Sequence, residues 1–259
     1  MKGVVLNELD ILNNILYNDY IEEKRPLSCL RILGKYYLGQ GLNRDETYSK
    51  LNEYMSKNYK GYSENNWYGK INGLIKNLEN YNNYDVVNVD KIVITEYEWN
   101  KIIKLNDKQL ERVAFILLVY QKIRKFKNKN NDGWIRNTIT DIFREASVTL
   151  KKEEKGKLLH KLYKKEYISI KNSCDSNGIK INYINTESKD KIIIDNFVNV
   201  ISYYYEYKNN EEWKECGACG KRFKKNNNKQ KYCNKCSKEI KLEQNKKSYD
   251  KNKENRKQL

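Results

Sequence analysis

Four cysteines near the C-terminus have the residue type and spacing to hold a metal ion. They form two Cys-x-x-Cys pairs separated by thirteen residues: Cys216, Cys219, Cys233 and Cys236. Zn²⁺ prefers four soft or borderline ligands in a tetrahedron, and a two-residue spacer lets both thiolates of a pair point to one centre. Glycine at positions 217 and 220 permits the tight turn that the first pair needs. The spacing therefore predicts one structural zinc ion without an open coordination position.

Paired cysteines have two other uses, which remain as alternatives. Disulfides are disfavoured in a reducing compartment. A redox Cys-x-x-Cys needs a single pair, usually in a thioredoxin-like context. The other two cysteines, Cys29 and Cys174, lie far from the four in the sequence and are expected to be free thiols.

The residues around the two pairs carry a resemblance to known modules. The pattern Cys-x-x-Cys-Gly-Lys-Arg-Phe, followed by Lys-Tyr-Cys-x-x-Cys, resembles the short zinc-ribbon modules at the ends of many bacterial and phage proteins. Phe223 and Tyr232 are the large apolar groups available for a miniature core beside the metal. The resemblance covers about residues 214–237 and implies zinc binding, but it is weak evidence for function.

Positive charge is concentrated in the same part of the chain. Residues 214–259 contain 16 Lys or Arg and 5 Asp or Glu, which is +11 of the +17 net charge of the chain. A basic module on a milder body is typical of nucleic-acid binding, although basic runs also occur as solvated tails. The side chains expected on phosphates are Lys221, Arg222, Lys224, Lys225, Lys229 and Lys231.

The segment 107–195 is expected to fold as helix, short strand, two helices and a hairpin. Apolar positions recur at helical spacing over 108–127, Thr138 and Thr149 can begin the two shorter helices, and Asn177-Gly178 indicates a hairpin turn. This order resembles a winged helix, in which the third helix enters the DNA major groove. By that resemblance residues 150–165 form the recognition helix, with Lys151, Lys152 and Lys155 among its basic groups, and residues 172–178 form the wing. Winged helices also serve as protein-interaction domains, which remains the alternative.

The remaining segments complete a mainly α fold with small β hairpins. Residues 1–105 predict a helical N-terminal domain, with short extended segments at 86–89 and 92–94 and capping boxes at Asn43 and Thr95. Residues 106–195 form the winged-helix-like domain. A strand is expected at 191–195. It is followed by a connecting helix in 196–213, which Asp195 caps. Residues 214–259 form the zinc ribbon and basic tail.

These features favour a nucleic-acid-binding regulatory or accessory protein, with double-stranded DNA preferred over RNA. The 42 Lys, 36 Asn and 9 Arg suggest A/T-rich codons, hence an A/T-rich bacterium or one of its mobile elements, such as a phage, as the source. The alternative is a module that inhibits or recruits a host nucleic-acid-processing or defence complex.

His160 is the only histidine, which disfavours multi-histidine enzyme sites and predicts no enzyme. The enzymatic alternative is a metal-dependent nuclease, for which Asp141 with Glu145 and Asp190 with Asp195 are the carboxylate pairs. The sequence contains no membrane-spanning apolar run, so a cytoplasmic protein is expected.

Overall fold

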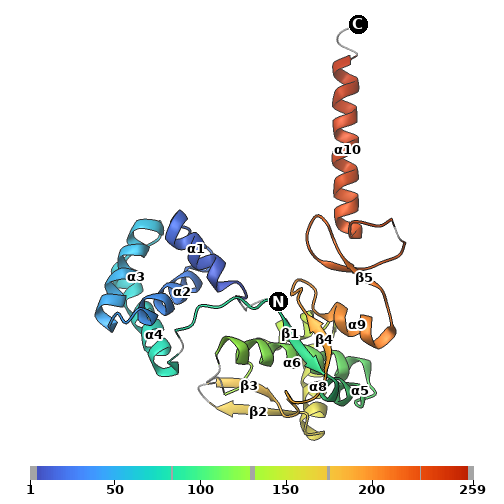
Figure 1. Cartoon of the computed structure of the whole chain (residues 1–259), viewed down its shortest axis with the longest axis horizontal. Helices are drawn as coiled ribbons and strands as arrows, with labels where there is room; N and C mark the ends of the chain where they lie inside the picture. The colour runs from blue at the N-terminus through green and yellow to red at the C-terminus, as the bar shows by residue number, and fades with distance from the viewer. Residues whose placement is uncertain (1–4, 83, 129–131, 174–175, 228, 256–259) are drawn as a thin grey trace.

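The protein is mainly helical, with small antiparallel sheets (Figure 1). The computed structural model describes residues 5–82, 84–128, 132–173, 176–227 and 229–255. These ranges contain ten helices and three two-stranded sheets, which confirms the expected fold class in this coarse sense. No helix in the described ranges is both long and apolar enough to cross a membrane.

The first four helices pack around a hydrophobic core of their own. Leu30, Leu51 and Ile71 are fully buried at its centre. Asn43 and Glu46 form the predicted capping box, in which the Asn43 side chain accepts from backbone N–H groups and Glu46 accepts from the Asn43 N–H. The four elements are α1 (Glu8–Asn18), α2 (Pro26–Gly39), α3 (Arg44–Asn58) and α4 (Glu64–Tyr81).

A second, larger core surrounds helix α6 (Lys108–Lys127). Residues 113–120 are fully buried, because neighbouring elements cover α6 on all sides. Those neighbours are β1 (Ile92–Thr95), α5 (Glu96–Ile103), α7 (Ile139–Glu145), α8 (Lys152–Lys164), β2 (Ile168–Ser173), β3 (Ser176–Ile181), β4 (Asp190–Ile194) and α9 (Ile201–Asn209).

The pairing of strand β1 differs from the sequence expectation. Residues 86–89 do not pair with it; β1 instead pairs antiparallel with β4, nearly one hundred residues later, with Ile92 opposite Ile194. Ile94 and Ile192 are thereby buried in the second core. Long-range pairing of this kind leaves no local sequence pattern. Along this part of the chain, the change from the first core to the second lies between Val86 and Val89.

The hairpin of β2 and β3 forms, but its turn is not where Asn177-Gly178 indicated. Asn177 and Gly178 lie within β3, opposite Asn172 and Lys171. Glycine suits this position of the strand, because the Trp134 ring lies 3.1 Å from where a Cβ would be. Residues 174–175 of the expected wing lie outside the described residues. The short strand expected at 134–136 is reduced to one bridge between Ile135 and Ile179.

Two of the expected helix starts are also wrong. Helix α8 begins at Lys152 rather than after Thr149, and its first turn is closed by Glu154, which accepts the Lys151 N–H at 2.8 Å. Helix α9 begins at Ile201, six residues beyond the expected cap Asp195. A helix start also depends on which residues pack beneath the first turn. The presence of Thr149 or Asp195 in the sequence does not indicate that packing. The caps at Thr95 and Thr138 are confirmed.

The C-terminal part consists of a short hairpin and a long helix. Strand β5 (Trp213–Glu215) pairs with β6 (Arg222–Lys224), and α10 (Asn234–Asn255) follows. Three of the four cysteines form the buried centre of this part, with Phe223 packed against them. Helix α10 projects away from the other elements (Figure 1).

Candidate metal centre

The four predicted ligands come together in space. The sulfur atoms of Cys216, Cys219, Cys233 and Cys236 all lie within 4.8 Å of one another. Sulfurs at the corners of a tetrahedron around Zn²⁺ lie roughly 3.8 Å apart, given Zn–S bonds near 2.3 Å. The Cys219 and Cys233 sulfurs are 3.9 Å apart, and the five described cysteines are all free thiols. The donor set therefore fits a thiolate-bound metal ion.

The first pair lies on the turn of the β5–β6 hairpin. The N–H of Gly220 donates to the Cys216 carbonyl at 2.9 Å, which closes the loop between the two cysteines. Gly220 has a φ of +66°, in the left-handed region that favours glycine. The Cys216 N–H donates to the Lys221 carbonyl at 3.1 Å, so the hairpin ladder continues into the metal site.

The second pair lies at the start of helix α10. Cys233 directly precedes the helix and Cys236 is in its first turn. The Cys233 N–H donates to the Cys216 sulfur at 3.3 Å, and the Ser237 N–H donates to the Cys233 carbonyl at 2.9 Å. The cluster thus joins a hairpin to a helix, and the metal would fix the direction in which α10 leaves the body.

The thiols have opposed tendencies to ionise. The Cys233 N–H bond lowers the pKa of Cys216 to about 6, against a smaller opposing effect of burial. Hydrogen bonds with the Cys219 and Cys233 side chains raise the pKa of Cys236 to about 12. The first thiolate is favoured, and a further one is opposed mainly by hydrogen bonds within the cluster and by burial, with a smaller contribution from the charge of the first. A bound cation removes that opposition.

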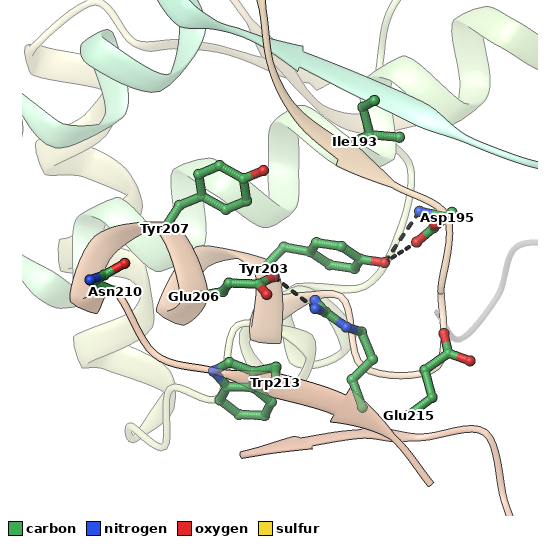
Figure 2. Close-up of a pocket in the computed structure, with 9 residues that line it drawn as sticks. Ile193, Asp195, Tyr203, Glu206, Tyr207, Asn210, Trp213 and Glu215 are labelled. Carbon is green, nitrogen blue, oxygen red and sulfur yellow. Dashed lines mark hydrogen bonds and ion pairs between the residues drawn. The ribbon is translucent and has the colours of Figure 1, made fainter. Parts of the chain in front are cut away.

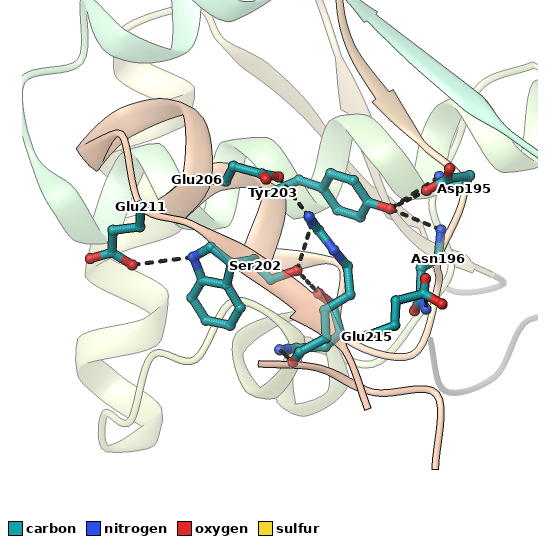
Figure 3. A network of polar contacts seen from close by, with 10 residues as sticks. Asp195, Asn196, Ser202, Tyr203, Glu206, Glu211 and Glu215 are labelled. Atoms are coloured by element: carbon teal, nitrogen blue, oxygen red, sulfur yellow. Dashed lines mark hydrogen bonds and ion pairs between the residues drawn. The ribbon is translucent and has the colours of Figure 1, made fainter. Parts of the chain in front are cut away.

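Helix α9 presents Ser202, Tyr203 and Glu206 to the cysteine module (Figure 3). Arg222 attaches the module to these residues. Its guanidinium pairs with Glu206 at 2.7 Å and donates to the Ser202 hydroxyl at 3.1 Å. It also lies 3.8 Å from the centre of the Tyr203 ring. Arg222 is 8% exposed. The buried guanidinium thus contacts a carboxylate, a hydroxyl and an aromatic face, so its role is structural.

Two asparagines and a stacked aromatic pair complete the attachment. Asn196 donates to Glu215 and to the Gly220 carbonyl, at 2.6 Å and 2.8 Å. Asn199 donates to the Arg222 carbonyl at 2.8 Å. Trp213 stacks on Tyr205, with ring centres 6.1 Å apart and an interplanar angle of 11°. The module is thus held by directional polar contacts rather than by a continuous apolar core.

A cavity of about 560 Å³ lies where α9 meets the module (Figure 2). Asp195, Glu206 and Glu215 line it together with Tyr207 and Trp213. All three carboxylates already have partners: the Tyr203 hydroxyl, Arg222 and Asn196, respectively. Glu206 and Glu215 are therefore occupied in holding the module to α9 and the segment before it, and Asp195 is occupied by Tyr203 of α9, so the cavity offers no free charge from them.

The residues predicted to bind phosphate differ in exposure and in their acidic partners. The prediction for Arg222 is wrong, because the side chain is buried in the attachment to α9. Lys224 pairs with Glu211 at 3.0 Å and Lys225 pairs with Glu212, so both have acidic partners. Lys221, Lys229 and Lys231 are exposed, as are Lys151 and Lys152. Lys155 is half-buried, with its ammonium 5.7 Å from the centre of the Phe143 ring.

Sequence reasoning missed the partners of Arg222. Ser202 and Glu206 precede it by about twenty residues on a different element, and no motif links them. One observation pointed to its special role: Arg222 is the only arginine among residues 145–255. In a lysine-rich segment an arginine marks a position that needs a planar, multidentate cation.

The carboxylate pairs considered for a nuclease have structural contacts. Asp141 accepts from the Thr138 hydroxyl at 2.7 Å and pairs with Arg144 at 2.5 Å. Asp195 accepts from the Tyr203 hydroxyl, and Asp190 lies at the end of β4 opposite Thr95. The described residues that gather enough ligands for a metal ion are the four cysteines.

Comparisons with known proteins returned no relative. No family model matches the chain, and no curated protein or solved structure matches it. The proposals below therefore follow from the chain's own residues.

Proposed function

We propose that this chain is a zinc-containing, nucleic-acid-binding protein that acts by binding, with duplex DNA as its preferred partner. Its skewed composition suits a regulatory or accessory protein of a phage or another mobile element. The proposal rests on the cysteine cluster, on the exposed charge of helix α10 and on the arrangement of α8 with its hairpin.

Zinc is the metal that four thiolates favour in a structural site. The ion supplies a positive centre that holds four thiolates together, and no residue of the cluster is left to activate a substrate. Three of the sulfurs belong to buried residues, which suits a permanent site rather than an exchanging one. Native mass spectrometry of the full chain should find one zinc ion per protein.

The observation that carries the proposal is the exposed charge of α10. Its 22 residues contain seven lysines and four acidic residues, and they extend over about 33 Å. Side chains from Ser237 to Tyr249 are exposed, except that of Ile240, which is half-buried. A helix that is polar on all sides has no apolar face to bury. A polyanionic partner lying along it supplies the missing interaction.

Helix α8 and its hairpin offer a second basic surface. Leu158, Leu159 and Leu162 are buried beneath α8. Its solvent side exposes Lys152, Lys157, Lys161 and Lys164. The strands β2 and β3 follow directly, and the order α6, α7, α8, β2, β3 supports the winged-helix interpretation. In that arrangement α8 approaches the major groove and its lysines contact phosphates.

The proposal is tested by fluorescence anisotropy with labelled duplex DNA, single-stranded DNA and RNA over a series of salt concentrations. Duplex binding should be tightest, and log affinity should fall with log salt at a slope of about −4.5 if about five phosphates are neutralised. Weak binding to all three probes at physiological salt contradicts the proposal.

Substitutions locate the interface. Replacing Lys238, Lys241, Lys246 and Lys247 with Gln should make the slope shallower by about 0.9 for each phosphate that is no longer neutralised. The matched control replaces Lys50, Lys70, Lys76 and Lys91, outside the proposed interface, and should leave the slope unchanged. Equal effects of both sets would show that net charge, not α10, determines binding.

An exposed apolar stripe favours protein interaction as the second candidate. Leu9 and Leu16 lie two turns apart on one side of α1, Tyr20 follows the end of the helix, and each is more than 40% exposed. Such a stripe can bury against a partner protein. If the nucleic-acid titrations fail, a host or phage protein that covers this face becomes the better explanation.

A further inference from the structure

A second cleft lies between the first helices and the core around α6. Its volume is about 480 Å³, which suits a nucleotide-sized ligand. Residues of both cores line it, from α1, α2 and α4 on one side and from the C-terminal part of α6 and residues 132–136 on the other. Clefts between two packed units are frequent ligand sites.

Three arginines converge on this cleft. Arg31 comes from α2, Arg124 from α6 and Arg136 from the segment before α7. The chain has nine arginines against 42 lysines, so a third of them share one cleft. Arginine differs from lysine in offering a planar fork of donors that matches a phosphate group.

The arginine charges are not neutralised by neighbouring carboxylates. None of the three takes part in an ion pair among the described residues. Burial lowers the pKa of Arg124, the nearby charges of Arg136 and Arg31 lower it further, and the charge of Asp132 opposes them more weakly. The three guanidinium groups therefore repel one another, and an anion between them would relieve that repulsion.

The acidic residues of the cleft are already engaged. Glu8 pairs with Lys35 at 2.9 Å and with Lys127 at 2.5 Å. Asp132 accepts from the Trp134 N–H at 3.1 Å. Glu8 thus balances two lysines, and Asp132 offsets one of the three arginine charges. The cleft lining therefore keeps an excess of positive charge for an external anion.

Arg124 has one donor in use and one without a partner. Its Nη2 donates to the Asn137 side chain at 2.9 Å, which fixes the guanidinium at the cleft. Its Nε is buried and has no hydrogen-bond partner in the part of the chain that the structure describes. A buried donor left unpaired is destabilising, and an anion in the cleft would give it an acceptor.

Aromatic side chains line the cleft beside the arginines. Trp134 is half-buried, with one part of its ring packed on Gly178, and Tyr81 lies at the opposite wall. An indole or phenol ring next to an anion site is suited to stack on a nucleobase.

We propose that this cleft binds a phosphate-bearing ligand of nucleotide size, with Arg31, Arg124 and Arg136 as the phosphate-binding side chains. The ligand is either a free nucleotide or the phosphorylated end of a nucleic-acid strand. The inference does not rest on the function of α10, because the cleft and that helix share no residue.

Isothermal titration calorimetry of the full chain with pyrophosphate and with ATP tests whether the ligand is a free nucleotide. Anisotropy with 5′-phosphorylated and 5′-hydroxyl single-stranded octamers tests the second. We expect saturable binding of ATP, or a preference of at least tenfold for the phosphorylated octamer. Arg136→Gln should weaken either by at least tenfold, and because Arg136 is exposed this variant should still fold. Arg31→Gln is a second variant of the same kind.

Arg44→Gln is the matched control, since it removes the same charge from an exposed position of α3 outside the cleft. It should change affinity by less than twofold. The proposal is overturned if neither ATP nor the phosphorylated octamer is preferred, or if Arg44→Gln weakens binding as much as Arg136→Gln does. Loss of duplex binding in the α10 lysine variants leaves this result unaffected, so the two proposals fail separately.

Discussion

The core around α6 and the cysteine module are both folded, but they differ in what stabilises them. Helix α6 is surrounded by apolar side chains from eight other elements, and residues 113–120 are fully buried. The cysteine module has three buried sulfurs and one packed phenylalanine. Its remaining stability comes from the contacts of Arg222 and the asparagines with α9 and its flanks.

The difference follows from size. A unit of about 25 residues buries too little apolar surface to offset the conformational entropy of folding. Metal ligation by the four cysteines would supply the deficit, because the binding free energy becomes folding free energy. The comparison therefore predicts that the two regions respond to different perturbations.

Metal removal should produce the largest effect and should act on one region only. Structural zinc contributes an apparent free energy of about 10–16 kcal/mol in small modules. After chelation, hydrogen exchange should lose protection over residues 213–236, while α6 stays protected. Far-UV circular dichroism should lose the helicity of α10, because α10 begins at the metal site and packs on little else.

Cys216→Ala should reproduce the effect of the chelator, and Cys29→Ala, in the first core, should keep one zinc ion per chain. Retention of protection in the cysteine module without metal would remove the basis of the comparison.

Cavity formation in the large core is the complementary perturbation. Phe143 is fully buried against α6, so Phe143→Ala should cost about 3–5 kcal/mol in the free energy of unfolding, measured by urea denaturation. Zinc stoichiometry by native mass spectrometry should stay at one. Ile170→Ala, at a position 37% exposed, serves as the control with a small cost. Zinc loss in the Phe143 variant would mean that the two regions fold as one unit.

Breaking the attachment should have an intermediate effect that is shared by both regions. Arg222→Gln leaves Glu206 without its cation, and we expect a loss of about 1–3 kcal/mol because Glu206 is partly exposed. Exchange should increase in β5 and β6 before it increases in α6. A double-mutant cycle with Glu206→Gln measures the coupling of the pair, and a coupling near zero would show that the attachment depends on the asparagines.

Gly220 provides the smallest and most local test. Its φ of +66° is strained for other residues, so Gly220→Ala should destabilise the cysteine module by about 1–2 kcal/mol. The control is Gly69→Ala in α4, where a Cβ meets nothing within 4 Å and helix propensity predicts a gain of about 1 kcal/mol. Hydrogen exchange measured as the temperature is raised gives a melting midpoint for each region, and the two midpoints separate the two effects. A destabilising Gly69 variant would show that α4 is constrained in a way its contacts do not reveal.

The sequence by itself determined the features that depend on short-range spacing. Two Cys-x-x-Cys pairs specified the ligand set, since each pair is local and thiolates have few other uses at that spacing. The apolar repeat of α6 and the capping boxes at Asn43 and Thr95 specified helices, because those interactions span only a few residues. The nucleic-acid partner remains a prediction from charge.

Tertiary structure decided every feature that joins distant residues. The pairing of β1 with β4, the shifted turn of the β2–β3 hairpin and the use of Arg222 as an anchor depend on partners that no local pattern names. The arginine cleft belongs to the same class, because Arg31 and Arg136 are about a hundred positions apart in the chain and meet only when two cores pack. Side-chain chemistry is encoded locally, but burial and pairing are properties of the folded whole, and they decide which of many similar charges remain free to bind.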